Sequence, residues 1–288
     1  MDALNDPDIP AVHRLGGGFV TPTSHHDSYD FIKPSQFDLN GRARISGLVL
    51  AARGDLSDTV NAITKTAKDT AIPIPKVVAL KFDVTDAKSV STAAAEVKKE
   101  WPEGIDIVYS NAGWLEPEKK IAESDPEDWW NSLAINVKGP YLVAREFIPL
   151  LLAKSGGLKT LLNMVSIGAH MIFPGMSAYN TAKLATCRLT EYEDAEYKDE
   201  GLISLCMHPG GVKTNMGLRL PPEKQKMLTD THELVSDTAV WCTAQRRDWL
   251  SGRYVSVQWD MKQLEEHKDE IVQKDLLKVK LDYGLGWL

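Results

Sequence analysis

A tyrosine and a lysine stand four residues apart in the run Ser177-Ala178-Tyr179-Asn180-Thr181-Ala182-Lys183. On a helix, this spacing places both side chains on one face, one turn apart. The positive charge of Lys183 favours the ionised phenolate, so we expect it to lower the pKa of Tyr179 from the reference value of about 10. A phenol with a lowered pKa exchanges protons near neutral pH, and the pair therefore predicts general acid–base chemistry.

The segments around this pair alternate between strand-like and helical patterns. Such alternation predicts an α/β fold, a doubly wound Rossmann-like parallel sheet in a single domain with helices on both faces. The expected strands are 48–52, 77–82, 105–109, 161–165, 202–207 and 254–258. The expected helices are 55–69, 86–100, 127–153, the helix that carries Tyr179 and Lys183, and 232–245.

Polar and glycine-containing motifs follow several of these strands. Ser110-Asn111-Ala112-Gly113 ends the third, Ser166 ends the fourth, and His208-Pro209-Gly210-Gly211 ends the fifth. In an open parallel sheet, ligands bind at the carboxyl ends of the strands. We therefore expect these residues to line one site together with the tyrosine and the lysine.

The composition is that of a soluble globular protein, with 43% hydrophobic and 25% charged residues in 288. A net charge of -7 without a basic cluster argues against nucleic acid as a partner. No apolar run reaches the roughly 20 residues of a membrane span, and the acidic N-terminus lacks the apolar segment of a signal peptide. Cys187, Cys206 and Cys242 are odd in number and widely spaced, which indicates a reducing compartment. We expect a cytoplasmic protein without a membrane partner.

Two adjacent histidines, His25 and His26, precede Asp27 and raise the question of a metal site. No cysteine or acidic cluster accompanies them, and a polar extension explains them equally well. We expect no metal.

The region Leu250-Ser251-Gly252-Arg253-Tyr254-Val255 and the tryptophan-rich composition resemble fungal members of the short-chain dehydrogenase/reductase family. Five parts of the sequence together resemble this family over residues 38–260. These parts are residues 110–113, Asn136, Ser166, the Tyr179 and Lys183 pair, and residues 208–214. Ser166 lies thirteen residues before Tyr179, a spacing typical of that family. The resemblance divides the chain into an N-terminal extension (1–37), a dinucleotide-binding catalytic domain (38–262) and a C-terminal helical tail (263–288).

The resemblance implies four catalytic residues. Tyr179 exchanges a proton with a carbonyl or alcohol oxygen, and Lys183 lowers its pKa and binds the nicotinamide ribose. Ser166 holds the substrate oxygen and stabilises developing charge. Asn136 orients a water molecule that relays protons towards the lysine.

The resemblance also implies a set of cofactor-binding residues. Besides Tyr179 and Lys183, the set contains Asp83, Asn111, Ala112, Gly113, Val212 and Thr214. Asp83 meets the adenine, residues 111–113 border the adenosine ribose, and Val212 and Thr214 contact the carboxamide end of the nicotinamide.

Arg53 bears on the choice of cofactor. NAD-binding sheets usually carry an acidic residue after the second strand, and Leu50-Ala51-Ala52-Arg53 offers none. A guanidinium at this place suits a 2′-phosphate, so the sequence favours NADP over NAD.

One part of the family pattern is missing. Asn40-Gly41-Arg42 resembles the start of the family's first strand, yet Gly47-Leu48-Val49-Leu50 already resembles its second. The absent strand, Gly-rich loop and helix amount to roughly 25 residues. Gly16-Gly17-Gly18 cannot replace the loop, because a phosphate-binding loop needs a strand before it and a helix after it.

Two explanations for this gap stay open. The sequence is an incomplete version of a working enzyme, which the complete catalytic set favours, or the protein has abandoned hydride transfer. The first implies an NADP-dependent oxidoreductase that interconverts a carbonyl and a secondary alcohol on a small molecule, with a role in secondary metabolism. Apolar residues in 216–227, where the family has a substrate lid, suit an apolar molecule. The second implies a non-catalytic relative that acts through binding or oligomerisation, and in either case we expect a homo-oligomer.

Overall fold

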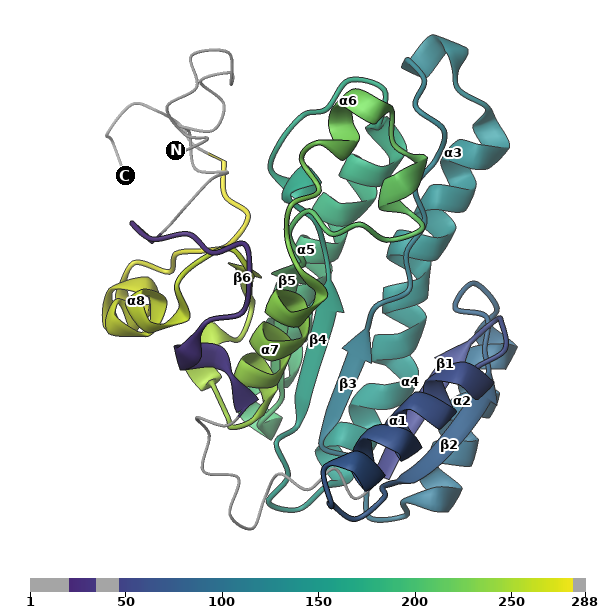
Figure 1. Cartoon of the computed structure of the whole chain (residues 1–288), viewed down its shortest axis with the longest axis vertical. Coiled ribbons are helices and arrows are strands. Elements are labelled where there is room, and N and C mark those ends of the chain that lie inside the picture. Colours follow the sequence, from purple (N-terminus) through teal and green to yellow (C-terminus); the bar gives the residue numbers. More distant parts are fainter. Residues whose placement is uncertain (1–20, 35–46, 282–288) are drawn as a thin grey trace.

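The structure, a computed structural model, describes residues 21–34 and 47–281. Parallel strands form its centre, in two sheets with the orders β1-β2 and β3-β4-β5-β6 (Figure 1). The strands are β1 (Gly47–Ala52), β2 (Lys76–Lys81), β3 (Ile107–Ser110), β4 (Thr160–Met164), β5 (Ile203–His208) and β6 (Arg253–Ser256). Each begins and ends within two residues of its predicted place, and the α/β fold is confirmed.

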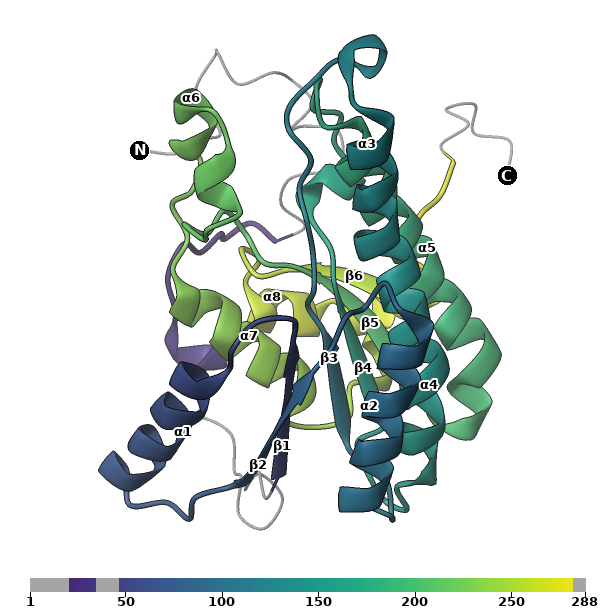
Figure 2. The ribbon, with the colours of Figure 1, turned by 90° about the vertical axis from the view of Figure 1, so that its right-hand side faces the viewer.

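Helices cover both faces of the strands. Figure 2 shows α2, α4 and α5 on one side and α1 and α7 on the other. The helices are α1 (Ser57–Asp69), α2 (Ala87–Glu100), α3 (Pro126–Leu133), α4 (Gly139–Ala153), α5 (Ser177–Tyr197), α6 (Pro222–Gln225), α7 (His232–Thr243), α8 (Met261–Glu266) and α9 (Lys268–Gln273). Three of these helices begin at a side chain that caps the helix. Asp86, Asp125 and Thr231 accept hydrogen bonds from backbone N–H groups at the starts of α2, α3 and α7, respectively.

The predicted helix 127–153 is interrupted at its centre. Between α3 and α4, residues Ala134–Lys138 form a π-helical turn. Such turns occur mostly inside α-helices and frequently at functional sites. This one contains Asn136, a predicted catalytic residue whose side chain is completely buried.

The strands divide into two sheets at the point where the strand order reverses. From this boundary, the order runs outward to β2 on one side and to β6 on the other. Among the described residues, no strand bridges β1 and β3, and Ile107 and Tyr109 of β3 remain 39% and 42% exposed. A missing central strand predicts this arrangement, since the strands on either side of it lose their shared partner. Residues 16–18 and 40–42 lie outside the described part of the chain.

Packing under α2 and α4 connects the two sheets. Phe82 and Val84, which follow β2, share a core cluster with Ile135, Leu142 and Val143. Val49 of β1 also packs against the cluster that contains Leu150 of α4. Apolar burial therefore replaces the strand pairing that is absent between β1 and β3.

Residues 21–34 pack against the end of the chain. Ile32 is fully buried in the largest core cluster, together with Trp259 and Met261. His25 donates its backbone N–H to the carbonyl of Gln258 at 2.8 Å, and Ser24 forms an antiparallel bridge with Trp259. This part of the predicted extension therefore lies beside the loop that follows β6.

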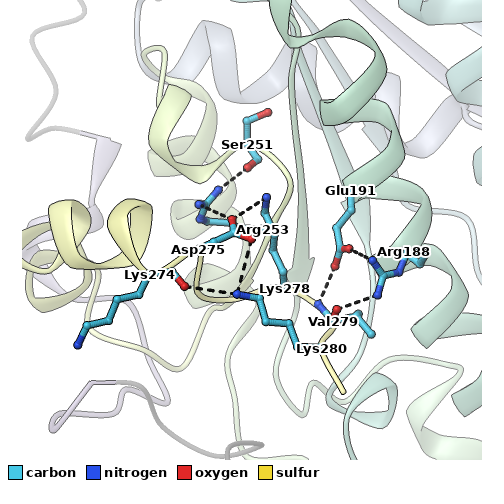
Figure 3. Close-up of polar contacts among 9 residues, drawn as sticks. All are labelled: Arg188, Glu191, Ser251, Arg253, Lys274, Asp275, Lys278, Val279 and Lys280. Carbon is cyan, nitrogen blue, oxygen red and sulfur yellow. Dashed lines mark hydrogen bonds and ion pairs between the residues drawn. The ribbon is translucent and has the colours of Figure 1, made fainter. Parts of the chain in front are cut away.

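The C-terminal segment crosses β6 and α5 (Figure 3). Asp275 accepts bonds from Arg253 at 3.1 Å and Lys278 at 2.8 Å. Val279 donates its backbone N–H to Glu191 at 2.6 Å, and its carbonyl accepts from Arg188 at 2.7 Å. The tail is thereby fixed over one end of the core.

Candidate active site

Three of the predicted catalytic residues meet where β4 ends and α5 begins. Ser166 follows β4, and its hydroxyl lies beside the Tyr179 phenol, whose pKa it lowers. Lys183, one turn further along α5, has its Nζ 5.5 Å from the centroid of the Tyr179 ring. The structure therefore brings Ser166, Tyr179 and Lys183 together.

The pKa of Tyr179 differs from the value that the sequence predicted. Burial raises the pKa of Tyr179 to about 12, with a smaller contribution from the Glu116 charge, and the Ser166 hydroxyl opposes both. Burial also lowers the pKa of Lys183 to about 8. The Lys183 amine donates to the carbonyl of Met164 at 2.9 Å. Burial outweighs any lowering of the Tyr179 pKa by Lys183 in this arrangement, and the predicted role of Lys183 stays a prediction.

Asn136 lies beside these three residues, and its side-chain amide already forms hydrogen bonds with other protein groups. Its Nδ2 donates to the carbonyls of Trp114 at 2.7 Å and Ser132 at 2.8 Å, and its Oδ1 accepts from the N–H of Trp114 at 3.2 Å. In this state the side chain clamps the segment after β3. The predicted role in orienting a water molecule stays a prediction.

Gly113 shows how tightly this corner is packed. A Cβ at this position would lie 3.2 Å from Asn136 Oδ1 and 3.7 Å from Lys183 Nζ. The methyl carbon of Met216 would be 3.6 Å away. A side chain here would press against Asn136, and Met216 brings the predicted lid into contact with the same corner.

The remaining predicted cofactor residues lie along the same sheet edge. Arg53 is exposed directly after β1, and Asp83 follows β2, the strand paired with β1. The N–H and hydroxyl of Thr85 donate to Asp83 and lower the pKa of its carboxyl, and the charge of Arg53 adds to this effect. Asn111 and Ala112 are exposed after β3.

Val212 and Thr214 follow β5 at the base of the lid. Val212 is buried, and the Thr214 hydroxyl accepts the N–H of Gly217 at 3.1 Å, which fixes the first turn of the lid. Arg53, Gly113 and Thr214 each follow the carboxyl end of a strand, where a dinucleotide would bind in an open parallel sheet. Such a cofactor would supply the hydride chemistry that these side chains lack.

The sequence prediction missed two buried carboxylates. Glu116 contacts the start of α5, as described below. Asp230 accepts from the N–H of Gly211 at 2.6 Å, from Gln258 at 2.9 Å and from His26 at 2.5 Å. The only sequence signal for Asp230 is its place just before the Thr231 cap, and Glu116 has no periodic signal at all.

The two adjacent histidines bind carboxylates separately. His25 pairs with Asp260 at 2.9 Å, whereas His26 pairs with Asp230. Within the described ranges, no group of three or more metal-ligating side chains is present. The histidines thus have a structural explanation.

A cavity of about 490 Å3 adjoins the lid on the side of α7. Its lining contains Lys213, Gln225, Lys226, Leu228, Thr229, Asp230 and His232. It lies next to the predicted nicotinamide loop and does not include Tyr179.

The fold and the site define an oxidoreductase-type dinucleotide-binding domain, and sequence comparison gives the family. The family profile described as short chain dehydrogenase matches residues 46–225, and the chain belongs to this family. It is 40% identical over 279 residues to the short chain dehydrogenase mpl6 of Monascus purpureus, covering 90% of this chain and 94% of that protein. It is 38% identical over 288 residues to the short chain dehydrogenase pigC of Monascus ruber, covering 92% and 94%.

Solved structures show the same fold. Levodione reductase matches with a TM-score of 0.66 and 19% identity, over 74% of this chain and 86% of that one. An NADPH-bound carbonyl reductase from chicken fatty liver matches with a TM-score of 0.62 and 20% identity, over 74% and 85%. In the part of the chain that the structure covers, no helix has the length and apolar character needed to cross a bilayer.

Proposed function

We propose that the protein is an NADP-dependent oxidoreductase that interconverts a carbonyl and a secondary alcohol on a small apolar molecule. The meeting of the Ser166 hydroxyl, the Tyr179 phenol and the Lys183 amine, 5.5 Å from the centre of the Tyr179 ring, carries the proposal. These groups can bind one carbonyl oxygen from two sides, because each hydroxyl donates a hydrogen bond.

Each residue then has a definite task. Tyr179 donates its proton to the carbonyl oxygen during reduction and removes a proton from the alcohol during oxidation. Ser166 donates a hydrogen bond to the same oxygen as negative charge develops there. The pKa of Lys183, about 8, lets its amine gain or lose a proton near neutral pH and so resupply the tyrosine.

Arg53 supports NADP as the cofactor. It is exposed at the end of β1, and the residues from Leu50 to Arg53 include no carboxylate that would bind ribose hydroxyls. A guanidinium binds phosphate through paired hydrogen bonds. An Arg53→Glu variant should therefore weaken NADPH binding more than NADH binding.

The lid supports an apolar substrate. Leu218 and Met227 are 52% and 56% exposed, and Met216 reaches the corner at Gly113. Apolar side chains bind a small molecule by removing its surface from water. The similarity to fungal short chain dehydrogenases also supports a role in secondary metabolism.

A second candidate is a non-catalytic relative that acts through binding or oligomerisation. The unpaired facing edges of β1 and β3 favour it, because a strand missing there would take a phosphate-binding loop with it. The alignment with mpl6 spans 279 positions but covers 90% of 288 residues, so about twenty aligned positions have no counterpart in this chain. Exposed Tyr141, Leu184 and Tyr192 on α4 and α5 offer an apolar surface for a homo-oligomer.

NADPH fluorescence titration and ketone turnover separate the two candidates. We expect saturable binding, reduction of a set of apolar ketones, and loss of turnover in Tyr179→Phe with binding retained. Tyr192→Phe is the matched control, since Tyr192 is an exposed tyrosine on the same helix. A folded oligomer that binds no NADPH at millimolar concentration would instead establish the non-catalytic candidate.

A further inference from the structure

Glu116 is a buried carboxylate at the start of the helix that carries Tyr179. Its Oε1 accepts the backbone N–H groups of Ala178 and Tyr179, each at 3.0 Å, and its Oε2 also accepts from Tyr179 at 3.1 Å. The side chain comes from the segment after β3, more than sixty residues earlier in the chain. The two segments are far apart in the sequence, and only the tertiary fold brings them into contact.

The contact satisfies a need of α5. The first N–H groups of any helix lack partners within it, and Met176, the residue before α5, supplies no side-chain cap. A carboxylate at a helix N-terminus pairs with these groups and with the positive end of the helix dipole. Glu116 therefore caps α5 at the predicted proton donor.

Glu116 also connects Tyr179 to Asn136. The Ser132 hydroxyl donates to Glu116 Oε2 at 3.1 Å, and Asn136 Nδ2 lies 3.3 Å from the same hydroxyl. All three side chains are buried. The network joins the segment after β3, the helix with the π turn, and the first turn of α5.

The charge of Glu116 acts on the phenol as well. A negative charge close to Tyr179 disfavours a second negative charge on its ring, and this effect adds to that of burial. A phenol with its ordinary pKa of about 10 is already protonated at neutral pH, and the charge of Glu116 extends this protonated range to higher pH. In the protonated form, Tyr179 donates a proton to a carbonyl oxygen.

We infer that Glu116 is a positioning residue that fixes the backbone at Tyr179 and contributes to the electrostatic environment of its hydroxyl. The inference deepens the proposed function and rests on it for its catalytic consequence. The effect on Tyr179 itself can be measured without cofactor or substrate.

The first test compares Glu116→Gln with Glu118→Gln. Both remove one carboxylate charge, but Glu118 forms an ion pair with Lys224 at 2.8 Å on the lid, whereas the N–H groups of Ala178 and Tyr179 bond to Glu116. NMR of protein labelled with 13C at the tyrosine Cζ, with Tyr179→Phe for assignment, reports the ionised fraction at pH 11. We expect this fraction to rise at least about threefold in Glu116→Gln and to stay unchanged in Glu118→Gln. Equal fractions in wild type and both variants would overturn the inference.

Glu116→Asp serves as a second variant if Glu116→Gln does not fold. It keeps the charge but withdraws the oxygens by one methylene from the N–H groups of α5. We expect the ionised fraction of Tyr179 to stay near the wild-type value, while kcat falls about tenfold and KM changes little. If this variant kept the wild-type kcat, Glu116 would have no role in positioning Tyr179.

The inference and the proposed function fail in different ways. If the wild type binds no NADPH but the ionised fraction responds to Glu116→Gln, the proposed function fails and the effect of Glu116 on Tyr179 stands. If the wild type reduces ketones and Glu116→Gln leaves both the ionised fraction and the pH profile of kcat/KM unchanged, the inference alone fails.

Discussion

Asn136 and Trp114 are joined by a reciprocal pair of hydrogen bonds. The side-chain amide of Asn136 donates to the Trp114 carbonyl at 2.7 Å and accepts from the Trp114 N–H at 3.2 Å. The buried amide thereby occupies both backbone groups of a residue in the loop after β3. This pair fixes the loop that carries Gly113 and Glu116.

Replacing Asn136 by alanine should therefore destabilise the protein. The change leaves the N–H and carbonyl of Trp114 without these partners, at a cost of about 1–3 kcal/mol for each buried group left unsatisfied. Urea denaturation measures the change in the free energy of unfolding. Asn131→Ala, at an exposed position of α3, is the control, and it should change stability by less than about 0.5 kcal/mol. If both substitutions lowered the free energy of unfolding equally, the hydrogen bonds between Asn136 and Trp114 would not stabilise the protein as expected.

Stability should fall with rising pH because of Glu193. This buried side chain on α5 accepts from Asn163 at 2.8 Å and from Ser204, and burial raises its pKa to about 7. Between about pH 4.5 and 7, the folded protein keeps a proton that the unfolded chain has released. The free energy of unfolding therefore drops by up to about 1.4 kcal/mol per pH unit and levels off above pH 7.

Glu193→Gln should remove this slope. Glu200→Gln, at an exposed position just after α5, should keep it. Thermal unfolding of the three proteins between pH 4.5 and 8 provides the comparison. Parallel curves for wild type and Glu193→Gln would show that another group carries the dependence.

The N-terminal segment should influence cofactor binding through His26. Its imidazole binds Asp230, which in turn accepts the N–H of Gly211 in the loop before Val212. Without His26, Asp230 loses one of its partners and the loop becomes less well fixed. We expect His26→Ala to raise the Kd for NADPH about threefold to tenfold.

His25→Ala is the matched control for this experiment. His25 pairs with Asp260, and no hydrogen bond links it to the glycine loop. Its Kd for NADPH should stay within about twofold of the wild-type value. A Kd that is equally raised in both variants would point to general damage of the N-terminal segment.

The C-terminal segment should protect two buried thiols. Cys187 and Cys206 lie with their sulfur atoms 3.8 Å apart, in a small cavity that Leu277 and Val279 help to close. The hydrogen bond from Cys206 lowers the pKa of Cys187 to about 6, so burial alone limits its reactivity.

A chain that ends at Lys274 should therefore react faster with a thiol reagent. We expect at least about a tenfold higher rate with 5,5′-dithiobis(2-nitrobenzoic acid), and Cys187→Ser should remove the added reaction. Cys242, which lies outside this cavity, provides the internal control. An unchanged rate would show that the tail does not protect the thiols.

Patterns local in sequence predicted most of the fold. Alternating strand and helix signals gave the six strands of the described region, and the helix over 127–153 differed only by its π turn. The spacing of Ser166, Tyr179 and Lys183 also predicted their meeting, since a strand end and one helical face place them. Predictions of this kind succeed because they depend on one element, or on two neighbouring elements.

The charges around Tyr179 could not be predicted in the same way. The sequence suggested that Lys183 governs the pKa of Tyr179, but burial contributes most to this pKa and the charge of Glu116 raises it further. Burial depends on every element packed around a group, and neither residue spacing nor residue type reveals it. The contacts of Asp230 with His26, 204 residues apart, were hidden for the same reason.

The sequence by itself determined the family motifs, the order of the strands and helices, and the absence of a Gly-rich loop from the expected place before β1. Only the tertiary structure decided that the sheet divides between β1 and β3, that Asn136 clamps Trp114, and that Glu116 caps the helix of Tyr179. The physical reason is the distance along the chain over which each interaction acts. Periodicity and capping act within a few residues, whereas strand pairing, burial and charge join residues that the chain holds far apart.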